Sequence, residues 1–201
     1  MSKYQKKKLL KRTSLPIVPV LGALLLVALV LTASGFAFAY TQEEHDTFCS
    51  SCHTQPESTF YQRALNAQAV DLASFHTAKG TRCIDCHSGA GLTGRIQAEL
   101  LGAHNSLALY THTAIQPAKQ TVPISDDNCL KCHQQVTAGR SRNNHFHGFL
   151  AEWQAVDPNA GTCVSCHGGH STDSNAQNRF QNQAIVSTVC DACHRVAGGG
   201  G

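Results

Sequence analysis

The pattern of apolar and polar residues divides the chain into a basic start, one long apolar run and a mixed remainder. Residues 3–12 carry six basic residues and no acid, and residues 15–39 carry no charge. An apolar stretch of roughly 20 residues is long enough to cross a bilayer as a helix. The pattern therefore predicts four parts: a basic tail at 1–14, a transmembrane anchor at 15–40, a folded domain at 41–197 and a flexible tail at 198–201.

The basic flank predicts the direction in which this helix crosses the membrane. Lys and Arg collect on the cytoplasmic side of a spanning helix. We therefore expect a cytoplasmic N-terminus and a domain on the outer face of a bacterial cytoplasmic membrane. Ala37-Phe38-Ala39 also resembles the cleavage site of a signal peptide. The apolar run is longer than the core of about 7–15 residues that such peptides have, so we expect a retained anchor.

Beyond residue 40, the periodicity favours short helices joined by loops. Between Gly91 and Tyr110, apolar residues recur every three or four positions, which is typical of a helix. The stretch from Phe146 to Val156 predicts a shorter helix that ends before Pro158. Segments that contain Asn, Ser, Gly and Pro indicate loops, and no segment gives a convincing strand pattern. The sequence thus predicts a mainly α-helical, loop-rich domain with little strand.

Charge and composition add two constraints on this domain. All thirteen acidic residues lie after residue 40, where ten Lys and Arg residues lie, so the outer part is acidic. An acidic domain gives no support for nucleic-acid binding and favours partners with positive patches. Aromatic residues make up only 6% of the chain, which leaves few large side chains to build a core.

The ten cysteines form five Cys-x-x-Cys-His units with none left over. The cysteines are Cys49, Cys52, Cys83, Cys86, Cys129, Cys132, Cys163, Cys166, Cys190 and Cys193, and the histidines that follow them are His53, His87, His133, His167 and His194. This spacing is typical of c-type haem attachment, in which two thiols bond the haem and the histidine binds its iron. Disulfides, zinc ribbons and redox-active thiol pairs have no reason to place a His after every pair. We expect five covalently bound haem c groups, stacked closely enough to form the core.

Seven further histidines are available as second iron ligands: His45, His76, His104, His112, His145, His147 and His170. The one methionine, Met1, lies on the predicted cytoplasmic side, so no haem can take a Met ligand from this domain. We therefore expect two His ligands at every iron, with His45 the least suitable because it lies only four residues before Cys49. Such filled iron suits electron transfer, whereas a nitrite- or hydroxylamine-type enzyme would need an open iron site.

The order of the motifs resembles the NapC/NirT/NrfH family of membrane-anchored, quinol-dehydrogenating cytochromes, which have one helix and four haems. The resemblance covers roughly residues 5–170 and is carried by residues 48–53, 76–87, 93–101, 129–133 and 161–170. It implies that His76 is the distal ligand of the fourth haem and that His170 is the distal ligand of the third. Either His145 or His147 would then be the distal ligand of the second haem, and the other would serve the fifth. The first haem would take His104 or His112.

Two departures separate this chain from that family. Gln55 stands where the family often has Met, and the fifth motif lies beyond the family's usual length. Five haems and one anchor also resemble the pentahaem subunit of alternative complex III. That resemblance implies a wire that receives electrons from a menaquinol-oxidising complex with iron–sulfur and polytopic membrane subunits, and passes them to an external cytochrome or copper protein. The alternative is a quinol dehydrogenase of the NapC/NirT/NrfH type that feeds a periplasmic reductase.

A quinol site would need a proton acceptor close to the membrane and to a haem. Arg95 and Glu99 lie four residues apart on a predicted helix and share a face, so they are candidates. A solvent-exposed ion pair, which contributes about 0.2–0.5 kcal/mol, is the simpler interpretation. Asp85 and Asp191, inside the second and fifth motifs, are expected to be solvated.

Overall fold

The computed structural model describes residues 17–52, 55–139 and 142–198. Within these ranges the regular elements are helices, and the one β-bridge is an isolated contact between His167 and Gln181. The prediction of a mainly helical fold with little strand is confirmed. The chain forms two compact units, residues 1–42 and residues 43–201.

The first unit contains helix α1 (Ile17–Gln42), which is long and apolar enough to cross a membrane. None of its residues is buried in the protein. A helix that is apolar on all sides and unburied by protein fits a lipid environment. The basic tail that predicts its orientation lies outside the described residues.

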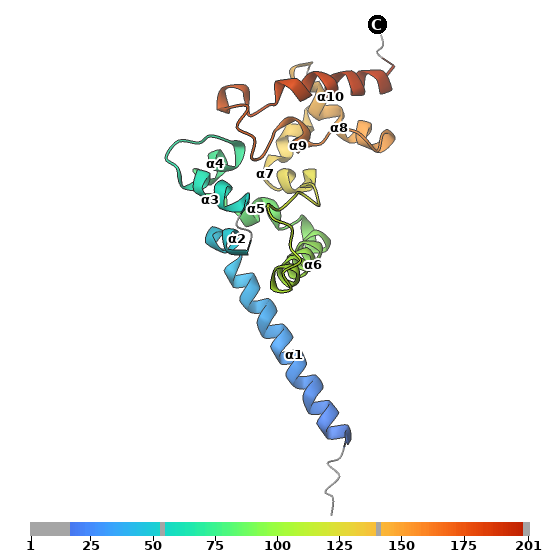
Figure 1. The fold of residues 1–201 in the computed structure, drawn as a ribbon. Helices are drawn as coiled ribbons and strands as arrows, with labels where there is room; N and C mark the ends of the chain where they lie inside the picture. The colour runs from blue at the N-terminus through green and yellow to red at the C-terminus, as the bar shows by residue number, and fades with distance from the viewer. Residues whose placement is uncertain (1–16, 53–54, 140–141, 199–201) are drawn as a thin grey trace, which may run out of the picture. The chain divides into compact units, whose positions relative to one another are not determined.

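The second unit consists of short helices joined by loops (Figure 1). In chain order they are α2 (Asp46–Cys52), α3 (Glu57–Leu65), α4 (Leu72–Thr77), α5 (Cys83–His87), α6 (Gly91–Tyr110), α7 (Asp126–Ala138), η1 (Arg142–Asn144), α8 (His145–Val156), α9 (Cys163–Cys166), η2 (Ala176–Asn178) and α10 (Gln183–Val196). The helices predicted at 91–110 and 146–156 are confirmed as α6 and α8. Of the predicted C-terminal tail, residues 199–201 lie outside the described residues.

Several of these helices begin at a side chain that caps their first turn. At the start of α4, the Asp71 side chain accepts a hydrogen bond from the N–H of Ser74 at 2.7 Å. At the start of α7, the Ser125 side chain accepts from the N–H of Asp127 at 3.2 Å. At the start of α10, the Asn182 side chain accepts from the N–H of Ala184 at 3.1 Å. Such caps satisfy backbone donors that have no partner within the helix.

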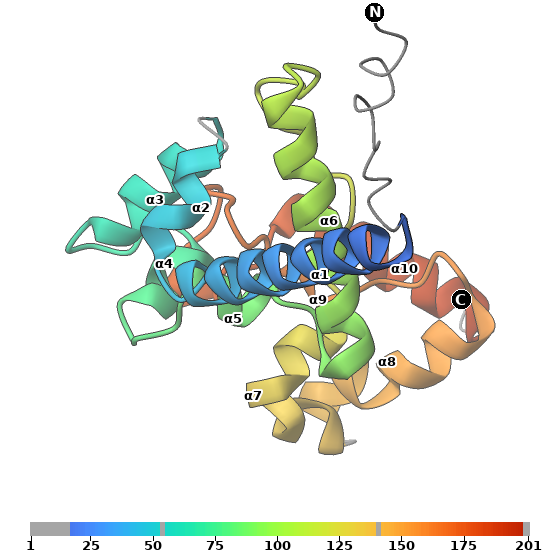
Figure 2. The same ribbon diagram turned by 90° about the horizontal axis from the view of Figure 1, so that it is seen from below.

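Helix α6 does not bury the apolar residues whose periodicity predicts it. Leu92, Leu100 and Leu107 lie along one stripe and are 79%, 61% and 64% exposed. The packed helices lie elsewhere in the second unit: Figure 2 shows α2 beside α3 and α7 beside α8, and both pairs are in contact.

The protein core of the described residues is small. Its buried apolar side chains are Leu150, Trp153, Cys166 and Phe180. Leu150 and Trp153 come from α8, while Phe180 packs on Phe75 of α4 with ring centres 5.3 Å apart. These few contacts leave most of the expected core to be supplied by groups other than side chains.

Candidate haem sites

Each Cys-x-x-Cys-His motif lies on or at the end of a helix of the second unit, namely α2, α5, α7, α9 and α10. These five helices contact one another in chain order, α2 with α5, α5 with α7, α7 with α9 and α9 with α10 (Figure 1). The side chain of Cys52 and all of His53 lie outside the described residues. The order of the motifs along the chain is therefore also their order in space.

Cysteines of successive motifs lie close together. A hydrogen bond with Cys83 lowers the pKa of Cys49, and the same bond raises that of Cys83. In the third and fourth motifs, a hydrogen bond with Cys163 lowers the pKa of Cys129 to about 7. The first cysteines of motifs one and two, and those of motifs three and four, are thus direct neighbours.

Weaker electrostatic contacts link the remaining motifs. Burial raises the pKa of Cys86, and the nearby Cys129 raises it further. Burial also raises the pKa of Cys166, with a further contribution from Cys190 of the fifth motif. Each of the first four motifs therefore has a cysteine that interacts electrostatically with a cysteine of the next motif.

Four motif histidines lie opposite a second histidine at a narrow range of distances. The ring centres of His87 and His170 are 6.3 Å apart, as are those of His167 and His147. The other two pairs are His194 with His145 at 6.3 Å and His133 with His76 at 6.0 Å. Direct ring stacking is much closer, as the 3.9 Å between Phe60 and His170 shows.

This spacing fits one metal ion between each pair of rings. An imidazole nitrogen binds a metal ion at about 2.0–2.1 Å and lies about 1.1 Å from its own ring centre, so two ligands on opposite sides of one ion have ring centres roughly 6.3 Å apart. The four pairs match this value to within a few tenths of an ångström. The residues present therefore fit bis-histidine haem iron.

Hydrogen bonds orient three of the rings in these pairs. Nδ1 of His76 lies 2.9 Å from the Leu72 carbonyl oxygen, and Nδ1 of His167 lies 2.8 Å from the Arg179 carbonyl oxygen. Nδ1 of His147 lies 2.8 Å from Oδ1 of Asn144. When Nδ1–H donates to an oxygen, the lone pair is on Nε2, which is the arrangement that second-shell partners give to metal-binding histidines.

Burial of the rings favours the neutral form of these histidines. Burial lowers the pKa of His87, His147 and His170. The nearby ring of His167 lowers the pKa of His147 further, and that of His87 does the same for His170. The neutral imidazole is the form that binds metal.

The ring partners differ from those that the family resemblance implies. His76 faces the third motif instead of the fourth, and His170 faces the second instead of the third. His147 faces the fourth motif, whereas the resemblance assigns it to the second or the fifth. His145 faces the fifth, one of its two implied positions. Tertiary packing sets these pairs: His76 of α4 lies beside His133 of α7, and the loop after α9 is hydrogen-bonded to Arg63 of α3 and Ala73 of α4.

Three other histidines have no ring contact with a described histidine. His45, His104 and His112 are exposed, and His104 lies on α6 while His112 follows it. Because His53 lies outside the described residues, the structure gives no ring partner for the first motif.

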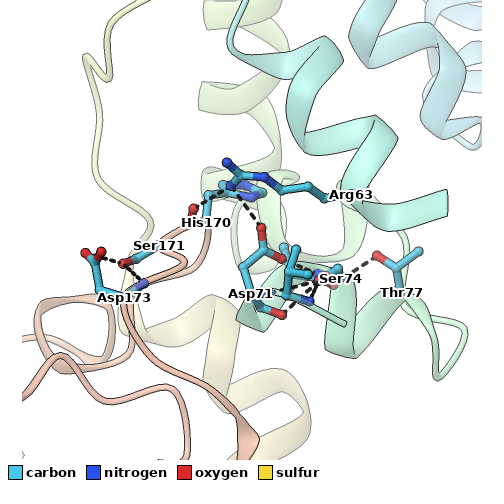
Figure 3. Close-up of polar contacts among 9 residues, drawn as sticks. Arg63, Asp71, Ser74, Thr77, His170, Ser171 and Asp173 are labelled. Atoms are coloured by element: carbon cyan, nitrogen blue, oxygen red, sulfur yellow. Dashed lines mark hydrogen bonds and ion pairs between the residues drawn. The ribbon is translucent and has the colours of Figure 1, made fainter. Parts of the chain in front are cut away.

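An ion pair holds the loop that carries His170 (Figure 3). Arg63 Nη1 lies 3.3 Å from Oδ2 of Asp71 and donates to the His170 carbonyl oxygen at 3.0 Å. Asp71 is 1% exposed and also caps α4. The next residue back, Gly169, accepts from the N–H of Ala73 at 2.9 Å. Sequence reasoning missed Arg63 and Asp71, because neither belongs to a motif.

Arg95 and Glu99 are part of a larger network than the sequence indicates. Arg95 binds both Glu99 and Glu43, and all three side chains are 20–25% exposed. The pair is therefore partly buried and not fully solvated. Burial raises the pKa of Glu99, and the charge of Glu43 raises it further.

The two motif aspartates have different surroundings. Hydrogen bonds from Arg82 lower the pKa of Asp85, which lies in an ion pair with that residue at 3.0 Å, so Asp85 is not simply solvated. Asp191 is exposed, as expected.

Motifs on contacting helices, with histidine pairs spaced for one iron, define the class of multihaem c-type cytochromes. The chain is 29% identical to the cytochrome c-type protein ImcH of Geobacter sulfurreducens, over an alignment of 133 residues that covers 61% of this chain and 23% of the relative. It thus spans about a quarter of the length of that curated relative. No family model and no solved structure matches the chain. The motifs, the apolar helix and this likeness support a membrane multihaem c-type cytochrome.

Proposed function

We propose that this chain is a pentahaem c-type cytochrome that conducts electrons through haem c groups attached at its five motifs. The observation that carries the proposal is the contact of the five motif helices in chain order, α2 to α5, α7, α9 and α10. Cysteines of successive motifs are electrostatic neighbours along the whole series. Attachment points placed in such a series favour a wire with one entrance and one exit.

The histidine pairs supply the axial ligands in this proposal. His87 and His170 would hold the second haem, His133 and His76 the third, His167 and His147 the fourth, and His194 and His145 the fifth. The first haem would take His53 and either His104 or His112. Haem iron with two His ligands exchanges electrons without binding substrate, so the chain would act as an electron-transfer subunit without substrate chemistry of its own.

The apolar helix α1 would anchor the haem domain to the outer face of a bacterial cytoplasmic membrane. Electrons would come from a menaquinol-oxidising complex with iron–sulfur and polytopic membrane subunits, as in alternative complex III. They would leave to an external cytochrome or copper protein. The excess of acidic residues after residue 40 suits an acceptor with a basic docking surface.

Purification from native membranes in mild detergent, with mass spectrometry of the accompanying proteins, tests this function. Intact-mass measurement of the chain itself should give five covalently attached haems. Iron–sulfur and polytopic membrane subunits travelling with the chain would support the wire. A chain with fewer than five haems would contradict the pentahaem proposal, and one that travels alone would contradict the complex.

The second candidate is direct quinol oxidation by this chain, and the Glu43–Arg95–Glu99 network favours it. Glu43 follows the last residue of the apolar helix, and partly buried carboxylates can accept protons. Glu99→Gln and Glu43→Gln in the purified chain would then slow reduction by a quinol analogue, while reduction by dithionite stays unchanged. Equal quinol reduction in both variants and the wild type would exclude this network as the proton acceptor.

A further inference from the structure

Two aspartates occupy equivalent places in two pairs of motifs. Asp46 is the first residue of α2 and stands three residues before Cys49, while Asp126 is the first residue of α7 and stands three residues before Cys129. Oδ1 of Asp46 accepts from the backbone N–H of Cys83 at 2.9 Å. Oδ1 of Asp126 accepts from the backbone N–H of Cys163 at 2.7 Å. In both cases donor and acceptor residues are 37 positions apart.

The surroundings of the two bonds repeat as well. Both Cys83 and Cys163 are the first residue of a short helix, where backbone N–H groups have no partner inside the helix. Both helices have a capping box with the residue two positions after this cysteine, Asp85 or Ser165. The described domain therefore contains one two-motif unit twice, with the first and third motifs as its starts.

From these repeated contacts we infer that Asp46 and Asp126 are positioning residues, each of which fixes the second motif of its pair against the first. The inference rests on the proposed haem attachment at these motifs. A hydrogen bond from an N–H to a carboxylate is about twice as strong as one between neutral groups. Because the hydrogen bond is made to the first cysteine of the next motif, it constrains a residue to which the second haem of the pair would be attached.

The carboxylates also place negative charge at these attachment points. Hydrogen bonds between the cysteines dominate the pKa shifts of Cys49, Cys83, Cys129 and Cys163. The charge of Asp46 acts on both cysteines of its pair of motifs, and so does the charge of Asp126, in each case against ionisation of the thiol. A negative charge beside a redox centre favours the oxidised form and lowers the reduction potential. Position and potential are therefore two separable effects of one side chain.

The two aspartates differ in one respect. Oδ2 of Asp126 also accepts from Nε2 of Gln154 on α8 at 2.7 Å, so Asp126 joins three helices. No such third partner is among the hydrogen bonds described for Asp46. Loss of the Asp126 carboxylate is therefore expected to disturb its pair of motifs more than loss of the Asp46 carboxylate.

Asn and Ala variants of both residues separate position from charge. Asp46→Asn and Asp126→Asn keep an oxygen acceptor and remove the charge, whereas Asp46→Ala and Asp126→Ala remove both. Asp127→Asn is the matched control, because Asp127 is an exposed neighbour in the same helical turn and carries the same charge. The probe is the full-length chain in detergent micelles, with its haem content checked by intact mass.

Electron paramagnetic resonance of the oxidised protein and potentiometric titration read out the two effects. We expect the Ala variants to lose spin coupling between the haems of the affected pair, and the Asn variants to retain it. Reduction potentials of that pair should rise in both kinds of variant and stay unchanged in Asp127→Asn. If an Ala variant fails to assemble while the matching Asn variant assembles, that difference also supports the positioning role, because the Asn side chain keeps the acceptor oxygen.

The inference of a positioning role is overturned if the Ala variants keep both the spin coupling and the potentials of the wild type, or if the Asn variants lose the coupling as the Ala variants do. Either result would show that the acceptor oxygen of the aspartate does not position the second motif of its pair. A wild-type chain without covalent haem would instead refute the proposed function, so that the two failures are distinguishable.

Discussion

Replacement of Asp71 by Ala tests how the loop that carries His170 is held in place. Oδ1 of Asp71 accepts from the N–H of Ser74, and Oδ2 lies 3.3 Å from Nη1 of Arg63. The same Nη1 donates to the His170 carbonyl oxygen. Asp71→Ala therefore removes a helix cap and leaves Arg63 without its ion-pair partner beside a proposed iron ligand (Figure 3).

The expected cost in free energy of unfolding follows from these two losses. Loss of an N-cap side chain costs about 1 kcal/mol. Removal of one partner of a buried ion pair costs about 3–5 kcal/mol when the remaining charge stays buried. The Arg63 side chain is 27% exposed and can regain water, so we reduce this second contribution to about 1–3 kcal/mol. The sum of about 2–4 kcal/mol corresponds to a fall in Tm of roughly 4–16 °C for a domain of this size.

Thermal unfolding of the purified protein, followed by circular dichroism, measures this cost, and absorption spectra report the iron spin state at the same time. Asp173→Ala is the control, because Asp173 is exposed and its carboxylate accepts from Oγ of Ser171 at 2.9 Å. Its expected effect is within about 0.5 kcal/mol. Equal melting temperatures for Asp71→Ala and Asp173→Ala would refute the role of the buried ion pair.

Four further predictions follow from other parts of the domain. Gly161→Ala puts a Cβ 3.0 Å from Cγ1 of Val189 and is expected to cost about 1–3 kcal/mol in a denaturant titration, whereas Gly169→Ala meets no atom within 4 Å and should cost less. His147→Ala is expected to convert one haem per chain to high-spin iron; an unchanged low-spin absorption spectrum would contradict its role as a ligand. Burial raises the pKa of Glu99, so the folded state favours the protonated form, and the free energy of unfolding should fall as pH rises through that pKa. Unfolding measured at several pH values should show a smaller fall for Glu99→Gln than for the wild type. The chain produced without haem attachment is expected to be unfolded by circular dichroism and sensitive to proteolysis.

Local sequence patterns predict the helices and the attachment motifs well, because each depends on neighbours in the chain. The periodicity between Gly91 and Tyr110 predicts α6, and each Cys-x-x-Cys-His unit lies on or at the end of a helix whose turn brings its cysteines together. The same periodicity says nothing about what the apolar stripe of α6 faces. That stripe is exposed in the second unit, where a core-facing helix would bury it.

Local sequence patterns could not predict which two histidines form each pair. His76 and His133 are brought together by the placement of α4 relative to α7, and no spacing rule fixes that placement. The ion pair between Arg63 and Asp71 depends on tertiary structure in the same way. A weak signal did exist for the positioning aspartates, since both the first and the third motif have Asp three residues before their first cysteine.

The histidine pairs and the small core have a common physical consequence. Histidine rings whose centres are 6.0–6.3 Å apart cover less of each other than the stacked rings of Phe60 and His170, whose centres are 3.9 Å apart. Only four of the described apolar side chains are buried, so the side-chain core is small as well. A haem held by each pair of histidines would supply the missing apolar surface and would bond to both rings. We therefore expect that attachment of the haems and folding of the domain are parts of one process.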